Sequence, residues 1–544
     1  MSSVDLTAAA SAVDCCREVV NTAIRHLTAA GERADAIIDA HQQVVYDLAH
    51  AASAVENARA VIDYGNKGPL EARLAAAFVA DAAFDVATRI LGREEEWGVS
   101  VGAVDPAMAF VRQYRSPAFM AKLAAEVAAA NGGPRHLDPD FEMVQDAFRR
   151  FADDVVRKHA EHVHRENADV PEEVISGLAE MGGFGLSVPE EYGGYATGGE
   201  GEYLGMVVAT EELSRGSLGI GGSLITRPEI ITRALVRGGT EAQKQFWLPK
   251  IAAAEIMAAV AVTEPDYGSD VAGLKVTATL TADGSHYAIN GVKTWCTFGA
   301  RANVLLLLAR TDPDRSKTHR GLSLFIVPKP VADGHGFVFT ETNPDGSVGK
   351  LEGRPIDTIG YRGMHSYEVA LENWQVPKEN LIGEETGLGK GFYFQMEGFE
   401  NGRLQTAARA VGLMQAAYEA AQAYAENRKV FGKNTVEYQI TAVKLARMAV
   451  IIQASRQFSY EVAKLMGKGE GAMEASMVKA YVCRAAEWVT REAMQIHGGM
   501  GYAEEYSVSR FFVDARVLSI FEGADETLCL KVIARRLLES AGAR

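Results

Sequence analysis

The chain has 544 residues, of which 48% are hydrophobic and 23% charged, and its formal net charge at pH 7 is -16. This length suits three or four domains of ordinary size, and the composition is typical of a soluble globular protein. The acidic balance argues against a nucleic-acid-binding protein, because neutralising phosphates requires a basic face.

Cysteine usage and hydropathy indicate a cytoplasmic protein. The five cysteines include no C-x-x-C pair, so we expect neither a metal site nor structural disulfides, as in a reducing compartment. The adjacent Cys15 and Cys16 are interpreted as small packing residues. The first residues contain no basic stretch followed by an apolar one, which predicts no signal peptide. No window reaches eighteen uncharged apolar residues, so we expect no membrane insertion.

Residues 1–130 show helical periodicity. Apolar residues such as Val45, Leu48 and Val55 recur at spacings of three and four, which predicts amphipathic helices. His41 and His50 have no partner pattern and are interpreted as packing residues. A cluster of Gly, Pro and Asp over residues 131–140 predicts a linker. The predicted domain boundaries along the whole chain are an N-terminal helical extension 1–130, a helical domain 141–257, a β domain 258–380 and a C-terminal helical domain 381–544.

The periodicity changes to two within residues 258–380. Lys275–Thr281 and Tyr287–Ile289 alternate, with Asp283–Gly284 as a turn between them, which predicts a β-hairpin. Asn290–Gly291 predicts a second turn. Residues 304–309 and 322–327 are continuous apolar runs typical of buried strands.

Helical periodicity returns after residue 388, with long runs over residues 403–427 and 437–466. Gly387–Gly391 is glycine-rich, but no Ser or Thr follows its lysine, so it predicts a turn before a helix rather than a phosphate-binding loop. Helices, strands and helices in separate blocks predict a multi-domain α+β protein, not an alternating α/β one.

Two separate motifs resemble the signature segments of the acyl-CoA dehydrogenase family. The first is Ala-Val-Thr-Glu-Pro-Asp-Tyr-Gly-Ser-Asp over residues 261–270. The second is Gln-Ile-His-Gly-Gly-Met-Gly-Tyr over 495–502, followed by Ile-Phe-Glu-Gly-Ala-Asp-Glu over 520–526. The one departure is Tyr267, where the family usually has a small residue. The resemblance covers residues 141–544 and implies a helical domain, an antiparallel β domain and a C-terminal helical bundle, here with an extra N-terminal helical domain.

The resemblance implies an FAD cofactor held between the β domain and the C-terminal helices. Arg428 and Phe431 match family positions that reach the flavin of a neighbouring subunit, so a homo-oligomer, at least a dimer, is expected. The matching cofactor-binding positions are Val262, Thr263, Ser269, Trp295, Thr297, Arg428, Phe431, Gln439, Gln495, Gly498, Gly499, Ala524 and Glu526.

The resemblance also implies α,β-dehydrogenation of an acyl-CoA thioester, with an electron-transferring flavoprotein as acceptor. Glu522 matches the base that removes the α-proton while flavin N5 takes the β-hydride. The N–H of Glu522 and a ribityl hydroxyl would bind the thioester oxygen. Gly402 stands where the isovaleryl-type branch carries its base, and glycine cannot serve. The positions matching coenzyme A contacts are Ser269, Phe399, Glu400 and Arg403.

The acyl group is indicated by the N-terminal extension and by residues 359–368 and 484–494. They look like the branch that oxidises (2S)-methylsuccinyl-CoA to mesaconyl-CoA in the ethylmalonyl-CoA pathway. A second carboxylate needs a cation or several donors. We hypothesise that Arg227, with one of His365 or Tyr367, binds it; the alternative is that Arg227 pairs with Glu229 or another acid at the surface.

Other functions remain open at this point. They are a dehydrogenase of short or 2-methyl-branched acyl-CoA, a flavin oxidase or monooxygenase, and a non-catalytic acyl-CoA-binding scaffold. Glutaryl-CoA is disfavoured as a substrate because Gly221 stands near the position of that branch's carboxylate-binding arginine. The extension is expected to pack on the dehydrogenase core, to cover a surface that tetrameric relatives use for assembly, and to leave a dimer.

Overall fold

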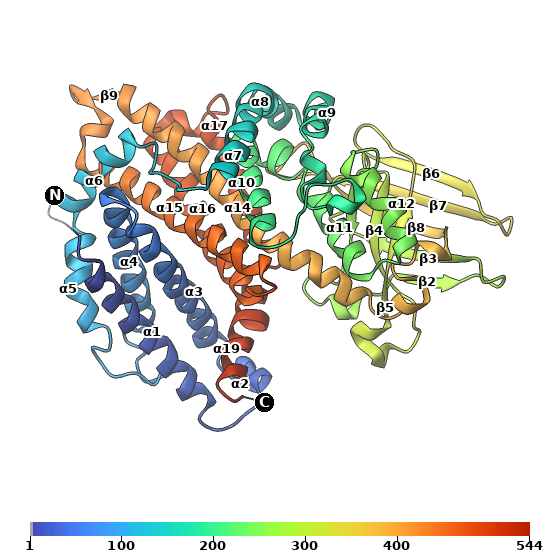
Figure 1. Ribbon diagram of the computed structural model, residues 1–544, viewed down its shortest axis with the longest axis horizontal. Helices are drawn as coiled ribbons and strands as arrows, with labels where there is room; N and C mark the ends of the chain where they lie inside the picture. Colours follow the sequence, from blue (N-terminus) through green and yellow to red (C-terminus); the bar gives the residue numbers. More distant parts are fainter. Residues whose placement is uncertain (1–3, 544) are drawn as a thin grey trace. The chain divides into compact units, whose positions relative to one another are not determined.

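The computed structural model describes residues 4–543 (Figure 1). The chain folds into two compact units. The terminal unit consists of Met1–Asp146 together with Thr406–Arg544, and the central unit of Ala147–Gln405. The first and last parts of the sequence therefore share one unit.

The extension is helical, as the periodicity predicts. Asp5 caps its first helix, since the carboxylate accepts hydrogen bonds from the N–H groups of Thr7 and Ala8. Pro69 and Pro117 stand at the first position of their helices, where the missing N–H costs nothing. The helices are α1 (Leu6–Thr28), α2 (Ala34–Ala40), α3 (Gln42–Gly65), α4 (Pro69–Ile90), α5 (Asp105–Tyr114) and α6 (Pro117–Ala129).

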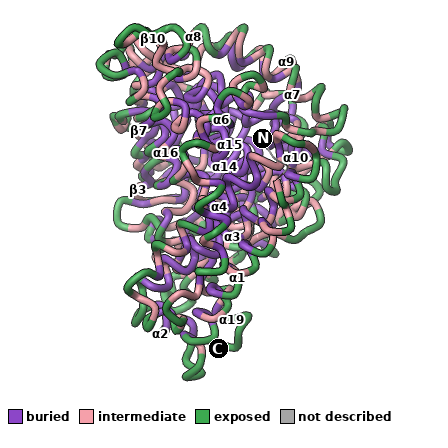
Figure 2. The backbone as a smooth tube through the Cα atoms, turned by 90° about the vertical axis from the view of Figure 1, so that its left-hand side faces the viewer, coloured by how far each residue is buried: buried purple, intermediate pink, exposed green. Residues whose placement is uncertain are grey.

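The terminal unit is completed by the C-terminal helices. These are α15 (Gln439–Gly467), α16 (Ala472–Ile496), η9 (Gly498–Tyr502), α17 (Ser507–Leu518), α18 (Asp525–Thr527), η10 (Leu528–Ala534) and α19 (Arg535–Ser540). Helices α3 and α4 pack against α15, and α3 also contacts α16 and η10. In Figure 2 α3, α4 and α15 are mostly buried. The extension therefore packs on the C-terminal helices, as predicted.

The central unit begins with helices. They are α7 (Pro139–Phe151, its start belonging to the terminal unit), η1 (Ala152–Val156), α8 (Arg157–Glu166), α9 (Glu172–Glu180), η2 (Gly183–Gly185), η3 (Glu190–Tyr192), α10 (Glu200–Gly216), η4 (Leu218–Gly222), α11 (Thr226–Gly238) and α12 (Glu241–Ala252). A capping box of Thr240 and Gln243 fixes the start of α12.

The β domain is one sheet with the strand order β1-β4-β2-β3-β8-β7-β6, and β5 pairs with β4. The pairs are antiparallel except β1–β4 and β2–β4, which are parallel, so the predicted antiparallel sheet contains two parallel neighbours. Ile231, Leu248 and Leu306 belong to one buried core between α11, α12 and the sheet. The strands are β1 (Ala258–Ala261), β2 (Thr277–Leu280), β3 (His286–Lys293), β4 (Val304–Arg310), β5 (Leu322–Pro328), β6 (Phe337–Thr342), β7 (Val348–Ile356) and β8 (Ser366–Pro377).

The second predicted turn, at Asn290–Gly291, is wrong. Both residues lie inside β3, where the register with β8 shifts between Ile289 and Gly291. Gly291 has φ +132°, which admits an irregular strand without a Cβ clash. The Asn290 side chain accepts a hydrogen bond from the N–H of Asn373 at 2.8 Å. A dipeptide that is typical of turns therefore forms a strand irregularity here.

The chain returns to the terminal unit through one long helix. After η5 (Val271–Gly273), η6 (Arg315–Gly321), η7 (Lys378–Asn380) and α13 (Glu384–Gly387), helix α14 runs over Gly391–Asn427. The short strands β9 (Lys429–Val430) and β10 (Lys433–Asn434) form a hairpin that leads through η8 (Thr435–Glu437) to α15. Among the helices within residues 4–543, none combines the length and apolar character needed to cross a bilayer.

Candidate active site

Three segments of the central unit are joined by backbone hydrogen bonds. The N–H of Thr294 donates to the Thr263 carbonyl at 2.8 Å. Following it, the N–H of Cys296 donates to the Tyr367 carbonyl at 3.0 Å, and that of Phe298 to the His365 carbonyl at 2.8 Å. These bonds unite the first signature segment, the stretch carrying Trp295 and Thr297, and the loop before β8. Of the predicted cofactor-binding positions, Val262, Thr263, Trp295 and Thr297 therefore come from adjoining backbone.

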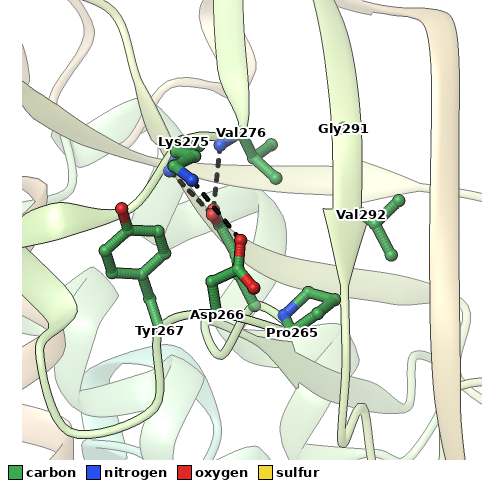
Figure 3. Close-up of a pocket in the computed structure, with 8 residues that line it drawn as sticks. Pro265, Asp266, Tyr267, Lys275, Val276, Gly291 and Val292 are labelled. Atoms are coloured by element: carbon green, nitrogen blue, oxygen red, sulfur yellow. Dashed lines mark hydrogen bonds and ion pairs between the residues drawn. The ribbon is translucent and has the colours of Figure 1, made fainter.

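A buried ion pair holds this arrangement. The Lys293 ammonium lies 2.9 Å from the Glu264 carboxylate and donates to the Val262 carbonyl at 2.9 Å. Glu264 also accepts from the N–H groups of Lys275 and Val276 at 2.7 and 2.9 Å (Figure 3). Burial lowers the pKa of Lys293 to about 8, and the charge of Glu264 opposes that shift. The pair ties three stretches of backbone together.

Tyr267, the departure from the family pattern, lies in a tight loop and faces a shallow pocket of about 220 Å³ (Figure 3). Glu264 and Tyr267 exchange backbone hydrogen bonds of 3.0 Å. The Lys275 ammonium lies 5.0 Å from the centre of the Tyr267 ring, as in a cation–π contact. The larger side chain is therefore accommodated at the surface of the loop, and Ser269 beyond it is exposed.

Four predicted site residues have left-handed backbone conformations. The φ angles are +57° for Trp295, +43° for His365, +50° for Phe431 and +53° for Glu522. Such angles are uncommon for residues other than glycine and cost on the order of 1–3 kcal/mol each. Strained residues of this kind concentrate at functional sites. The coincidence of these four residues with predicted site positions supports the predicted site independently of the sequence resemblance.

The central unit exposes one aromatic ring among the predicted cofactor positions, and the terminal unit exposes another together with two glycines. Trp295 of the central unit is 54% exposed and Phe431 of the terminal unit 95% exposed, so both present aromatic surface to a planar ligand. A Cβ on Gly498 or Gly499 would meet no heavy atom of the described residues within 4 Å. The backbone there is therefore open to a diphosphate. These observations fit the predicted FAD.

The remaining predicted cofactor residues differ in exposure between the two units. The Thr297 hydroxyl lies 3.1 Å from that of Ser366, and Val262 is buried. The Arg428 carbonyl accepts from the N–H of Thr435 at the base of the hairpin. Ala524 is half-buried, whereas the side chains of Arg428, Gln439, Gln495 and Glu526 are exposed.

Glu522, the predicted base, is held by a buried arginine that the sequence did not reveal. The Arg409 guanidinium donates to Oε1 of Glu522 at 2.7 Å, and the Thr406 hydroxyl lies 3.4 Å from Oε2. The side chains of Arg409 and Glu522 are 0% and 6% exposed. In addition, the Lys479 ammonium donates to the Gly523 carbonyl at 2.6 Å. The available sequence signal was an arginine in an otherwise small and apolar stretch of α14.

The residues that follow Glu522 are held in place by side chains of the N-terminal extension. Asp525 lies 3.1 Å from Nε2 of His50 and accepts a hydrogen bond from the Tyr46 hydroxyl. The thiol of Cys529 is 3.4 Å from the same His50 nitrogen. Burial lowers the pKa of His50. His50 is thus a hydrogen-bonded packing residue, as predicted, whereas His41 is exposed at the junction of α2 and α3.

The predicted acyl-pocket residues of the central unit form two sets. Arg227, near the start of α11, is buried, and its Nη2 donates to the Tyr361 hydroxyl at 3.3 Å. His365 lies 3.0 Å from the Asp169 carboxylate, and the Tyr367 hydroxyl donates to the Gly334 carbonyl at 3.2 Å. The His365 ring holds the pKa of Asp169 below its usual range. Tyr361 is a contact of Arg227 that the sequence analysis did not single out.

The candidate coenzyme A contacts lie on α14 within the central unit. Phe399 packs on the core of the sheet, and Glu400 and Arg403 are half-buried. In η4, a Cβ on Gly221 would meet the Leu213 carbonyl oxygen at 2.4 Å. A side chain at that position therefore does not fit, which agrees with the absence of a glutaryl-type arginine there.

Comparison with known proteins gives the same assignment along most of the chain. The N-terminal, middle and C-terminal domain models of acyl-CoA dehydrogenase match residues 138–255, 259–374 and 389–538. The (2S)-methylsuccinyl-CoA dehydrogenase of Cereibacter sphaeroides is 42% identical over 453 residues, 82% of this chain and 79% of that protein. The bovine mitochondrial short-chain specific acyl-CoA dehydrogenase is 33% identical over 73% of this chain and 90% of its own.

A comparison with solved structures supports the same family. The glutaryl-coenzyme A dehydrogenase in complex with glutaryl-CoA superposes with a TM-score of 0.67 at 31% identity, over 75% of this chain and 97% of that one. Domain matches, identity and fold together leave one conclusion: the chain belongs to the acyl-CoA dehydrogenase family of FAD-dependent oxidoreductases.

Proposed function

We propose that the protein dehydrogenates a short branched dicarboxylyl-CoA, (2S)-methylsuccinyl-CoA, to mesaconyl-CoA in the ethylmalonyl-CoA pathway. The observation that carries the substrate is the 42% identity to a protein of that activity, over 82% of this chain. The bovine short-chain specific acyl-CoA dehydrogenase aligns with only 73% of this chain. The similarity to (2S)-methylsuccinyl-CoA dehydrogenase therefore extends over a larger share of the sequence. Kinship of this degree supports a shared substrate class.

In this proposal Glu522 removes the α-proton. Its carboxylate is buried and attached to a strained residue, which holds it in one position. The N–H of the same residue polarises the thioester oxygen. FAD, when bound beside Trp295 and Thr297, supplies the hydride acceptor for the β-hydrogen. An electron-transferring flavoprotein is the proposed acceptor of those electrons, and a cytoplasmic homodimer the proposed form of the enzyme.

For the distal carboxylate we propose Arg227 together with either His365, just before β8, or Tyr367, at the start of β8. A buried guanidinium is a strong carboxylate ligand because it offers two parallel donors. His365 and Tyr367 have partners of their own in Asp169 and the Gly334 carbonyl. Tyr361, which Arg227 already contacts, adds a second hydroxyl, from the loop before β8.

A substrate panel tests the proposal. The purified flavoprotein is assayed with methylsuccinyl-CoA, butyryl-CoA, isobutyryl-CoA and glutaryl-CoA and an artificial one-electron acceptor. We expect kcat/KM for methylsuccinyl-CoA to exceed the others by about tenfold or more, equivalent to ~1.4 kcal/mol of transition-state discrimination. A preference for butyryl- or isobutyryl-CoA would leave the family and the base but remove the dicarboxylyl substrate. Rapid reoxidation by air with peroxide formed would instead indicate an oxidase.

Arg227→Ala tests the proposed carboxylate contact. The loss of a charged hydrogen-bond partner should lower kcat/KM for methylsuccinyl-CoA by about 10- to 100-fold, mainly through KM, and leave butyryl-CoA nearly unchanged. Arg227→Lys should recover only part of the loss, since an ammonium does not reproduce the planar guanidinium. Equal losses with both substrates would remove Arg227 from the carboxylate site.

A further inference from the structure

The loop that carries Glu522 has an unfavourable backbone conformation and closes on itself. Glu522 and Gly523 have left-handed φ angles of +53° and +99°, and such an angle is costly for a glutamate. The N–H of Asp525 donates to the Ser519 carbonyl at 3.1 Å, which closes the loop 519–525 with Glu522 as its middle residue. The position of the Glu522 carboxylate therefore depends on how the two ends of this loop are held.

The side chain of Asp525 anchors one end of the loop. Its Oδ2 atom accepts a hydrogen bond from the Tyr46 hydroxyl and lies 3.1 Å from Nε2 of His50. This side chain is only 10% exposed. Burial disfavours its charged form, but the hydrogen bonds from His50 and Tyr46 outweigh burial and hold the pKa of Asp525 below its usual value. Asp525 is thus a buried anion that can only accept hydrogen bonds, so Nε2 of His50 carries the proton.

Both donors to this carboxylate come from one face of helix α3. Tyr46 and His50 are four residues apart, which places them on the same side of a helix, and their rings meet edge to face at 4.7 Å. The helix is itself fixed, because Asp47 accepts hydrogen bonds from Arg89 and Arg93 of the extension, each at 2.8 Å. Helix α3 also packs against α16 and η10. The two side chains therefore extend from a well-anchored element.

Helix α3 lies outside the part of the chain that the family domain models match, whereas Glu522 lies inside it. Those models match residues 138–255, 259–374 and 389–538, and α3 covers Gln42–Gly65. Proton transfer needs a short and directed approach, so a misplacement of about 1 Å can slow a reaction on the order of 100-fold. A contact from α3 that holds one end of the loop therefore bears on the rate.

We propose that Tyr46 and His50 of the N-terminal extension are positioning residues for the dehydrogenation. Through Asp525 they hold the loop 519–525 so that the Glu522 carboxylate stays where it can remove the α-proton. The extension thereby contributes to the reaction as well as to packing, although neither side chain is assigned a contact with substrate or flavin. This inference rests on the proposed role of Glu522 as the base and not on the identity of the acyl group.

The first test removes one hydroxyl from α3 at two positions. Tyr46→Phe deletes the donor to Asp525, whereas Tyr64→Phe, the control, deletes a hydroxyl that donates to the Pro134 carbonyl at 2.9 Å. Each holoenzyme is mixed without oxygen with the preferred substrate of the panel, expected to be methylsuccinyl-CoA. The bleaching of the flavin then gives the limiting rate of reduction and the substrate Kd.

The two variants should differ in rate and resemble each other in stability. We expect Tyr46→Phe to lower the limiting rate of flavin reduction about tenfold, with the substrate Kd changed by less than about twofold. Tyr64→Phe should keep the wild-type rate. Both variants should lower Tm by a similar amount, because each loses one hydrogen bond. A role of Tyr46 in stability alone would not separate the rate from the Kd.

A second test asks whether the two side chains act through Asp525. His50→Gln keeps an N–H donor, whereas His50→Leu has none. The rate of flavin reduction should fall about tenfold in His50→Leu and stay within about threefold of wild type in His50→Gln. Asp525→Ala removes the shared acceptor, so adding Tyr46→Phe to it should cause little further loss.

The outcomes separate this inference from the proposed function. If Glu522→Gln reduces the flavin at the wild-type rate, Glu522 is not the base, and both are overturned. If Glu522→Gln loses the reaction while Tyr46→Phe and Tyr64→Phe reduce the flavin equally fast, this inference alone is overturned. Equal losses in His50→Gln and His50→Leu, or full additivity of Tyr46→Phe and Asp525→Ala, would overturn it as well.

Discussion

Two buried ion pairs of the protein have similar distances and burial, but we expect one to stabilise the fold and the other to serve the reaction. Lys293–Glu264 in the central unit and Arg409–Glu522 in the terminal unit both join a nearly inaccessible cation to a glutamate, at 2.9 and 2.7 Å. Glu264 also accepts hydrogen bonds from two backbone N–H groups, so its carboxylate oxygens are part of the backbone hydrogen-bond network. Glu522 is held by side chains, on a residue with φ +53°. A carboxylate held by side chains can change partners during a reaction, whereas one bonded to backbone cannot without local unfolding.

The largest effect that this contrast predicts is on activity. Glu522→Gln removes the proton acceptor while keeping the size of the side chain, so kcat/KM should fall by about 100- to 10,000-fold. Flavin content and Tm should stay close to wild type, because Arg409 can still donate to the amide oxygen. Steady-state kinetics with methylsuccinyl-CoA and a thermal scan measure the two properties. More than a tenth of the activity remaining would disprove the assignment of the base.

The corresponding Glu-to-Gln substitution in the Lys293–Glu264 pair should lower the stability of the fold. Glu264→Gln leaves the Lys293 ammonium buried without its carboxylate, at an expected cost of about 3–5 kcal/mol in the free energy of unfolding. Differential scanning calorimetry of the holoenzyme would show a lowered Tm. Glu352→Gln, in an exposed ion pair with Lys350 and Arg354 on β7, is the control and should change Tm little. Similar Tm values for the two variants would contradict the contrast.

A third buried cation predicts a smaller, pH-dependent effect. Burial lowers the pKa of Lys329 to about 7, and its ammonium donates to the carbonyls of Ala300 and Pro330. An unfolded lysine titrates near 10.4. Between about pH 7 and 10 the unfolded chain therefore binds a proton that the folded chain does not, so this group raises the unfolding free energy as pH rises.

Lys329→Met removes that contribution. The Tm of the variant should exceed that of wild type by about 2–4 °C at pH 6.5, where the charged lysine is still buried, and the gap should narrow by pH 9. Parallel thermal scans across this pH range measure the gap. A gap that stays constant with pH would show that Lys329 does not titrate in this window.

The order of the structural blocks could be predicted, and Glu522 could be proposed as the base, because both signals lie in local stretches of sequence. The change of period near residue 260 marked the strands, and the segment around Glu522 is continuous in sequence. Asn290–Gly291 misled because the same dipeptide suits a turn and a bulge, and only the pairing of β3 with β8 decides between them. Local sequence therefore predicts elements better than the way they pair.

Arg409 could not be predicted for a related reason. An arginine within a helical run usually extends its charge to solvent, and its position in the sequence is 113 residues from Glu522. The same holds for Tyr46 and His50, which reach Asp525 from the other end of the chain. Contacts between distant segments depend on the tertiary fold, which no motif in this sequence encodes.

The terminal unit is built from both ends of the chain, and this has a consequence for biosynthesis. Helices α3 and α4 leave the ribosome early, but their partners α15 and α16 are among the last segments translated. The intervening 259 residues of the central unit can fold meanwhile. The apolar faces of the early helices must stay exposed during that interval, a condition that favours aggregation and the binding of chaperones. We therefore expect the yield of this enzyme in heterologous expression to respond strongly to lowered temperature and to added chaperones.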